Sequence, residues 1–467
     1  MDNIFDNTYL NLPEIFYSES TPAVFSTPHL IAFNRELAST LGFDQLVNYD
    51  ELRLAKIFSG QEKLPGGSYI SQNYCGHQFG HFNPQLGDGR AVLIGETKAP
   101  NKKDIQLKGS GPTAYSRRGD GFSELGPVLR EYLVSEYMYS QGVPTTRALA
   151  ACATGDKVYR ETPAPGGVFT RVASSHIRIG TFEFFSARQQ IEDLKLLLQY
   201  SIDRHYPEFS KMDGDQQIIS FLKAVASNQS FMISKWMQIG FIHGVMNTDN
   251  MSISGETLDF GPCAFMDQFK KDKVFSFIDR HSRYAYNNQL QIGIWNLYQL
   301  ANSLLPLMKS PTEIETMEAA LVECQSLYAT NFQKQMLQKY GLDSFDQFEK
   351  LNNLFLEFLE INNLDFTNSF RLLTDSPEKL KTIKGSELFF ELWPSDEADK
   401  ELMNKTNPVV IARNHLVQKA IQKAYEGDYS FFNQCLNVFT KLDTNPSEEF
   451  KSAPTVDQAI KNTFCGT

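Results

Sequence analysis

The apolar residues follow different patterns in the two halves of the chain. Between Tyr69 and about Gly180, short apolar runs alternate with glycine-rich turns, a pattern typical of strands. The strands that we expect are Arg90–Gly95, Asp104–Lys108 and Gly167–Val172. A helix is expected over Pro127–Gln141, with proline at its start and Gly142 after its end. This part of the chain therefore predicts a small sheet with one prominent helix.

Beyond about Phe182 the apolar residues recur at three- and four-residue spacing, which predicts helices. The clearest examples are Gln216–Trp236, Leu290–Met308, Thr312–Tyr340, Phe345–Glu360 and Pro408–Tyr425. A further helix-like piece lies around His29–Leu41.

The fold class that these patterns predict is α+β and two-lobed, with a small β-rich lobe and a large helical lobe. We expect an N-terminal extension at residues 1–60, the β-rich lobe at 61–182, the helical lobe at 183–445 and a mobile tail at 446–467. A chain of 467 residues is long enough to need more than one core, which agrees with two lobes.

Charge and composition narrow the function classes. The net charge of −11 argues against a general nucleic-acid or anionic-membrane binder. Met1–Asn7 has neither the basic and apolar regions of a signal peptide nor the arginines of a transit peptide, and no apolar run reaches 18 residues. Six scattered cysteines form no Cys-x-x-Cys pair. We expect a cytoplasmic monomer without nucleic-acid or membrane partners.

The clearest candidate for chemistry is the turn His243–Asn250, followed by Asp259-Phe260-Gly261. Kinases place a catalytic Asp two residues after such a His, an Asn five residues later, and then Asp-Phe-Gly, in which the Asn and the second Asp hold magnesium. In this chain Asn250 and Asp259 occupy the magnesium positions, but Val245 stands where the base belongs. A different carboxylate, Asp249, directly precedes Asn250. The pattern predicts a site that binds ATP and Mg²⁺ but does not perform ordinary γ-phosphoryl transfer.

The segment between the two metal positions predicts how they meet. Met251–Leu258 reads as a strand, a glycine turn and a second strand. A hairpin brings its two ends together, so Asn250 and Asp259 can share one cation through hard oxygen ligands.

Several cationic residues upstream are candidates for phosphate contacts. Gly87-Asp88-Gly89-Arg90 opens a strand as a glycine loop does, although an ordinary hairpin turn explains it equally well. Lys108 ends a strand, and either Glu131 or Glu136 on the following helix can pair with it, since spacing does not choose between them. Arg171 and Arg178 add two guanidinium groups, which suit bidentate phosphate contacts but also occur as ordinary surface residues. Together with Arg90 and Lys108 they make four cations, a number that suits a site that holds the β- and γ-phosphates as a leaving group.

Two histidines, His77 and His81, stand four residues apart, as in a zinc helix. Gln78 replaces the glutamate of that motif, and Gly76 and Gly80 disfavour a helix, so we do not expect a metal here.

Six motifs together resemble one known family. They are Gly76–Gly80, Leu86–Ala91, Gln106–Gly111, Tyr115–Gly121, His243–Asn250 and Asp259–Pro262. On these motifs the chain resembles the selenoprotein O (SelO/YdiU) family of pseudokinases from about Tyr69 to its end. The family usually has Asp-Tyr-Gly where this chain has Phe260, a loss of one hydroxyl.

The resemblance implies a kinase-like fold that binds ATP in a flipped orientation and transfers AMP to protein hydroxyls of Ser, Thr or Tyr. It implies Asp249 as the proton acceptor, Asn250 and Asp259 as ligands of Mg²⁺ or Mn²⁺, and Lys108 paired with Glu131. The nucleotide contacts that it implies are Gly87, Gly89, Arg90, Lys108, Asp120, Gly121, Arg171, Arg178 and Asp259. Two other functions stay open, namely protein uridylyl transfer from UTP with manganese, and a non-catalytic nucleotide-binding scaffold.

The last expectation concerns redox control. Cys263 directly follows Asp259–Pro262, and Cys465 is the third residue from the end of the chain. A disulfide between them would tie the tail across the site, and cytosolic disulfides are more often regulatory than structural. The alternative is a buried apolar Cys263 and a free thiol at Cys465.

Overall fold

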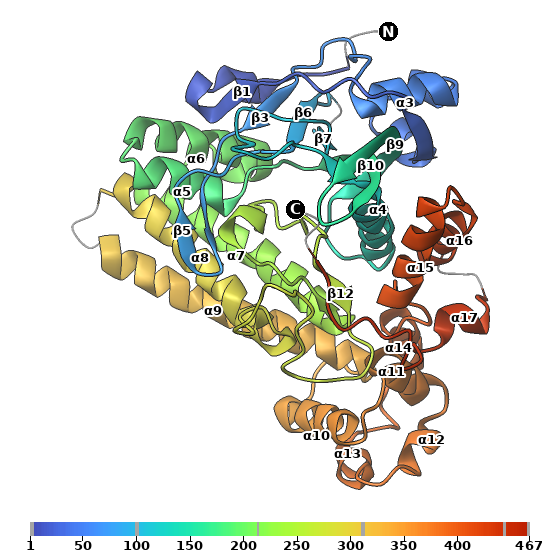
Figure 1. Cartoon of the computed structure of the whole chain (residues 1–467). Coiled ribbons are helices and arrows are strands. Elements are labelled where there is room, and N and C mark those ends of the chain that lie inside the picture. The colour runs from blue at the N-terminus through green and yellow to red at the C-terminus, as the bar shows by residue number, and fades with distance from the viewer. Residues whose placement is uncertain (1–3, 99–101, 213, 310–312, 442–444, 465–467) are drawn as a thin grey trace.

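The protein is a mixture of helices and an antiparallel sheet, described here from a computed structural model over residues 4–98, 102–212, 214–309, 313–441 and 445–464. The sheet lies at one end of the molecule, and the long helices α7, α8 and α9 lie below it (Figure 1). The strand order in the main sheet is β1-β3-β6-β7-β10-β9-β2, and β8 pairs with β10. The expectation of an α+β fold is met by this arrangement.

The strands of the main sheet are β1 (Tyr17–Glu19), β2 (His29–Phe33), β3 (Ile70–Gln72), β6 (Ala91–Glu96), β7 (Asp104–Lys108), β8 (Ser123–Glu124), β9 (Arg147–Tyr159) and β10 (Pro163–Ala173). Two separate pairs are β4 (Gly76–Gln78) with β5 (His81–Asn83), and β11 (Phe241–Ile242) with β12 (Ala264–Phe265).

The alternation of side chains along β7 places two polar residues on the face of the sheet that lies toward α4. Ile105 and Leu107 are fully buried in the apolar cluster that contains residues of α3 (Glu51–Ser59). Because successive side chains of a strand point to opposite faces, Gln106 and Lys108 project from the other face, toward α4 (Leu125–Ser140). One polar residue and one cation are thereby placed between the sheet and the helix.

Beyond Phe182, the predicted helical segments agree with observed helices to within a few residues, except that α15 begins at Asn414, six residues after the predicted Pro408. In chain order the observed helices are α1 (Arg35–Thr40), α2 (Asp44–Val47), α3, α4, α5 (Ile179–Ala187), α6 (Ile191–His205), α7 (Gly214–Gln238), α8 (Gln289–Leu304), α9 (Glu313–Lys339), α10 (Phe348–Ile361), α11 (Phe366–Asp375), α12 (Pro377–Lys381), α13 (Glu387–Leu392), α14 (Lys400–Thr406), α15 (Asn414–Tyr425), α16 (Ser430–Thr440) and α17 (Glu448–Lys451). Within the described ranges, no helix combines the length and apolar character that crossing a membrane requires.

The N-terminal segment differs from the prediction. His29–Phe33, expected to be helical, is strand β2, and only Arg35–Thr40 forms a helix. Asn34 separates the two elements, because its side chain accepts a hydrogen bond from the backbone N of Leu37 at 3.0 Å and so caps the helix. Strands β1 and β2 form the two edges of the main sheet, so Tyr17–Glu19 and His29–Phe33 are both part of the sheet.

The described part of the C-terminal tail packs against the rest of the protein. Phe450 is buried and stacks on Phe431 with ring centroids 5.9 Å apart. Thr463 exchanges backbone hydrogen bonds with Phe275 and Phe277, and its hydroxyl donates to the carbonyl of Pro262. The described tail is thus in contact with the rest of the protein at two points, and the four-part division with its mobile tail stays a prediction.

Candidate active site

The predicted catalytic turn is held together by contacts with neighbouring elements. Asp249 and Asn250 lie in a short 3-10 helix, Thr248–Asn250, and an isolated antiparallel bridge joins Met251 to Thr257. The expected strand pair over Met251–Leu258 does not form beyond this bridge. Ser252 and Thr257 instead bridge to Arg178 and Thr145, so neighbouring segments take up the backbone groups that a hairpin would pair. The bridge still returns the chain from Asn250 toward Asp259.

Asp249 has the environment of a proton acceptor. Its side chain is buried, its Oδ2 accepts a hydrogen bond from Nε2 of Gln78 at 3.1 Å, and its Oδ1 has no hydrogen-bond partner among the described residues. Burial raises the pKa of Asp249 to about 6, while the Gln78 hydrogen bond and the charge of Arg178 oppose this rise. A carboxylate with a pKa near 6 and one unoccupied oxygen is suited to accept a proton near neutral pH.

Lys108 lies between two carboxylates. Its Nζ is 2.6 Å from Oε2 of Glu131 and 2.7 Å from Oδ1 of Asp259. Glu136, the other candidate partner on α4, instead pairs with Arg147, with Oε1 to Nε at 2.8 Å. The structure thus places Glu131, and not Glu136, beside Lys108.

Asp259 is surrounded by positive charge. Burial alone would raise its pKa, but Lys108, Arg90 and Arg171 outweigh burial and hold the pKa of Asp259 well below its usual range. The residue adopts a left-handed backbone conformation with φ of +70°, which Asp tolerates better than most residues. The side chain is therefore ionised at any physiological pH and available to a cation.

Asn250 and Asp259 fit a hard cation such as Mg²⁺. The Nδ2 of Asn250 donates to the carbonyl of Val245 at 3.0 Å, which leaves Oδ1 as the amide atom available to a metal. Among the described residues, no group of three or more His, Cys, Asp or Glu side chains can hold a metal alone. A cation bound by this pair would need further oxygen ligands, such as phosphate oxygens and water.

Two arginines are oriented by a buried carboxylate that sequence reasoning missed. Asp88 accepts from Nε2 of Gln106 at 3.0 Å, and Oε1 of Gln106 accepts from Nε of Arg171 at 2.7 Å. Asp88 Oδ1 also lies 3.6 Å from Nη2 of Arg178. The Nη1 of Arg178 donates to the carbonyl of Asp249 at 3.1 Å, so this arginine links the carboxylate to the catalytic turn.

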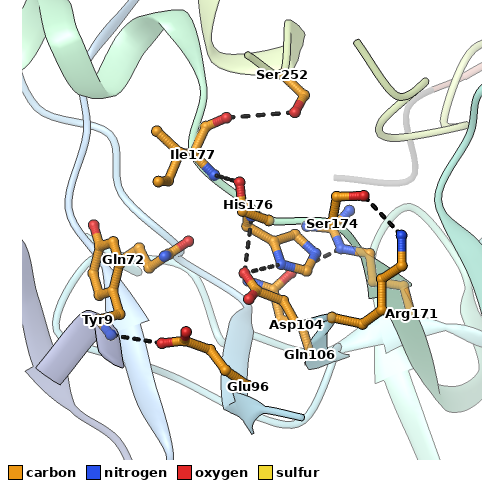
Figure 2. A network of polar contacts seen from close by, with 12 residues as sticks. Tyr9, Gln72, Glu96, Asp104, Gln106, Arg171, Ser174, His176, Ile177 and Ser252 are labelled. Atoms are coloured by element: carbon orange, nitrogen blue, oxygen red, sulfur yellow. Dashed lines mark hydrogen bonds and ion pairs between the residues drawn. The ribbon is translucent and has the colours of Figure 1, made fainter. Parts of the chain in front are cut away.

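A buried polar network lies beside Arg171 (Figure 2). Asp104 contacts the backbone N and the Nδ1 of His176, at 2.9 and 3.2 Å, and pairs with Arg204 at 2.6 Å. Arg204 also pairs with Glu96, which accepts from the backbone N of Tyr9. Burial and the charges of Arg171 and Arg178 lower the pKa of His176 well below its usual value, so this histidine is neutral. The network joins β6, β7 and α6 and so fixes the strand that carries Lys108.

The glycine loop borders a pocket of about 270 Å³. It is lined by Tyr74, Gln78, Leu86, Gly87, Gly89, Arg90, Tyr115, Ser116, Arg117, Gly119, Asp120, Gly121, Phe122, Arg160 and Asp249. A smaller hollow shares Arg90 with this pocket and contains Lys108, Glu131 and Asp259. Arg90 therefore lies between the glycine loop and the cluster around Lys108.

Two glycines of the pocket cannot be replaced without a shift of their neighbours. Gly87 and Gly121 have φ of +75° and +71°. A Cβ at Gly87 would lie 2.4 Å from the ring of Tyr115, and one at Gly121 would lie 2.2 Å from the backbone of Gly111. Asp120, predicted to contact nucleotide, forms a two-point ion pair with Arg160 at the exposed rim.

The structure describes the histidine pair and one of the two cysteines. His77 and His81 belong to the hairpin β4–β5, and His77 Nδ1 contacts Glu183 at 2.5 Å. Cys263 is a buried free thiol, and burial raises its pKa to about 12. Cys465 lies outside the described residues, so the expected disulfide stays a prediction.

Comparison with known proteins identifies relatives along the whole chain. The family model described as protein adenylyltransferase SelO matches residues 1–440. Proteins named protein nucleotidyltransferase YdiU are similar to this chain in Agrobacterium fabrum, with 44% identity and 99% of each chain covered, and in Ruegeria sp., with 45% identity and 100% of each chain covered. A Bacillus cereus protein of the same name is 45% identical and covers 99% of this chain and 98% of its own.

Proposed function

Because the chain belongs to the SelO family of protein adenylyltransferases, we propose that this nucleotidyltransferase transfers AMP from ATP to the hydroxyl groups of Ser, Thr or Tyr in proteins. Pyrophosphate is the second product. The observation that carries this proposal is that the proposed proton acceptor, Asp249, and the cation Lys108 lie in two adjoining hollows. Asp249 lies on the glycine-loop pocket with one unoccupied carboxylate oxygen among the described residues, while Lys108 lines the adjoining hollow and Arg90 borders both.

We propose that the β-rich lobe and the helical lobe are arranged as in a kinase, and that ATP binds in a flipped orientation. In this orientation the β- and γ-phosphates lie among Lys108, Arg171 and Arg178, and the α-phosphorus lies nearer Asp249. Both arginines are held by Asp88, one directly and one through Gln106, so the guanidinium groups are fixed before nucleotide arrives. Preorganised cations stabilise the charge that develops on the leaving pyrophosphate.

The proposed reaction needs one proton acceptor and one leaving group. The unoccupied Oδ1 of Asp249 accepts the proton of the substrate hydroxyl as the hydroxyl oxygen forms a bond to the α-phosphorus. The bond between the α-phosphorus and the bridging oxygen to the β-phosphorus breaks, and its electron pair leaves with pyrophosphate. Val245 cannot accept a proton, which supports the assignment of Asp249.

Asn250 and Asp259 are the proposed ligands of Mg²⁺ or Mn²⁺. Such a cation would supply positive charge to the phosphate oxygens of the nucleotide. Lys108 contacts Asp259 directly, so the lysine holds this carboxylate in place for the cation.

Labelled nucleotides test the proposal directly. The protein is incubated with a mixture of candidate proteins, Mg²⁺ or Mn²⁺, and ATP labelled at either the α- or the γ-phosphate. Transfer of the α label only is the expected result, and transfer of the γ label would instead show a kinase. A parallel reaction with α-labelled UTP and Mn²⁺ tests uridylyl transfer, and nucleotide binding without any label transfer would indicate a scaffold.

A further inference from the structure

The hairpin β4–β5 contacts the catalytic turn at three consecutive residues. The backbone N of His77 donates to Oγ1 of Thr248 at 2.7 Å, and the backbone N of Phe79 donates to Oδ1 of Asn247 at 3.0 Å. Between them, Nε2 of Gln78 donates to Oδ2 of Asp249 at 3.1 Å, across 171 residues of sequence. A segment distant in sequence thus determines the position of the turn.

Two buried side chains hold the hairpin and the turn together. Glu183 of α5 accepts from the hydroxyl of Thr248 and contacts Nδ1 of His77 at 2.5 Å. On the other side, Oη of Tyr284 lies 2.5 Å from Oδ1 of Asn247 and 3.2 Å from the backbone N of Phe79. The hairpin therefore has a fixed register against the turn, so a side chain on it can be directed accurately.

Gly76, the first residue of the hairpin, packs closely against the turn. A Cβ at Gly76 would lie 3.0 Å from Oδ1 of Asp249 and 3.0 Å from Oγ1 of Thr248. The absence of a side chain leaves that oxygen of Asp249 without an obstructing neighbour at this point.

The amide of Gln78 is itself oriented. Nδ2 of Asn83, at the end of β5, lies 3.4 Å from Oε1 of Gln78 and acts as its donor. With its oxygen turned toward Asn83, Gln78 presents its NH₂ group to Asp249, and both residues line the same pocket.

We propose that Gln78 is the positioning residue for Asp249 in the proposed transfer reaction. Gln78 donates to Oδ2 and holds the carboxylate, so Oδ1, which has no hydrogen-bond partner among the described residues, is the oxygen that receives the proton of the substrate hydroxyl. A neutral amide performs this task without adding a charge beside the nucleotide phosphates. This inference rests on the proposed function and extends it to a residue of the Gly76–Gly80 motif.

The test compares Gln78→Met with the wild-type chain in the assay with α-labelled ATP. Methionine keeps the length of the side chain but cannot donate to Asp249. We expect kcat to fall roughly 10- to 150-fold, the size expected for one lost hydrogen bond to a charged group, with the KM for ATP unchanged within about twofold. Gln85→Met is the matched control, because Gln85 donates to Asn73 at 2.8 Å and not to Asp249, and it should leave kcat unchanged.

A double-mutant cycle separates positioning from general damage to the fold. If Gln78 acts only through Asp249, then Gln78→Met should reduce the residual rate of an Asp249→Asn variant no further. An undiminished kcat in Gln78→Met, a loss through the KM for ATP, or a further loss on the Asp249→Asn background would overturn the role. A wild-type chain that transfers no α label would overturn the proposed function itself, and this role with it.

Discussion

The two buried glutamates of α4 offer a matched pair of substitutions. Glu131 and Glu136 are 3% and 4% exposed, and both pair with basic side chains. Glu131 pairs with Lys108 at 2.6 Å and with Arg171 at 3.5 Å, and Glu136 pairs with Arg147 at 2.8 Å. Glu131 contacts Lys108 at the proposed phosphate site, whereas Glu136 contacts Arg147 and the backbone N of Ala148. Substitution by glutamine keeps the shape of each side chain and removes its charge.

We expect Glu131→Gln to weaken nucleotide binding. Lys108 would lose a charged hydrogen bond of 2.6 Å and would be drawn toward its remaining partner, Asp259 at 2.7 Å. Hydrogen bonds to charged groups contribute about 1.5–3 kcal/mol, which corresponds to an increase of roughly 10- to 150-fold in the Kd for Mg²⁺–ATP if the whole loss appears in binding. Because Asp259 still holds Lys108, we expect the lower end of this range.

Glu136→Gln should behave differently. It weakens a two-point ion pair with Arg147, so we expect a lower Tm and an unchanged Kd for Mg²⁺–ATP. Titration with a fluorescent ATP analogue measures binding, and thermal unfolding without nucleotide measures stability. Equal Kd values for the two variants, or a larger increase in Kd for Glu136→Gln, would refute the assignment of Glu131 to the nucleotide site.

Three further substitutions test other contacts. Asp259→Ala removes the central cation ligand, so α-label transfer should fall below detection and the Mg²⁺ dependence of nucleotide binding should disappear; retained Mg²⁺-dependent binding would contradict the ligand assignment. Gln106→Leu leaves Nε of Arg171 without its partner at 2.7 Å, and a raised KM for ATP is expected, whereas an unchanged KM would separate Arg171 from the phosphates. Burial lowers the pKa of His205 to about 3, below the value of about 6.5 expected when unfolded. The stability that His205 contributes is therefore complete above pH 6.5 and decreases as the pH falls toward 3, by up to about 1.4 kcal/mol per pH unit, so His205→Gln should flatten the dependence of Tm on pH between 7 and 5.

The elements that the sequence predicted correctly are those in which the local pattern of apolar residues agrees with the burial of those residues in the fold. Asp104–Lys108 is a strand with the predicted bounds, and α4 begins two residues before the predicted Pro127. The helix expected at His29–Phe33 was wrong, because the conformation of this segment is decided by pairing with β9, more than a hundred residues away. Local propensity cannot reveal a partner at that distance.

The residues of the candidate site also differ in how well the sequence predicts them. The motif around Asp249 and Asp259 is visible in the sequence because its residues are close together. Gln78 stands out there only as a replacement for a zinc-motif glutamate, and Asp88 only as part of a glycine loop. Their contacts with Asp249 and Gln106 join separate segments, so spacing gives no signal for them. The sequence indicates Gln78 and Asp88 through their positions inside the motifs Gly76–Gly80 and Gly87–Arg90.

The two edges of the main sheet have a consequence for synthesis of the chain. Residues 17–33 supply both outer strands, but β1 pairs with β3 at Ile70–Gln72 and β2 pairs with β9 at Arg147–Tyr159. On the ribosome the outermost strands emerge first, and their inner neighbours follow tens to more than a hundred residues later. The first segment made must therefore wait unpaired, and it closes the sheet against association with other chains only when the central strands have formed.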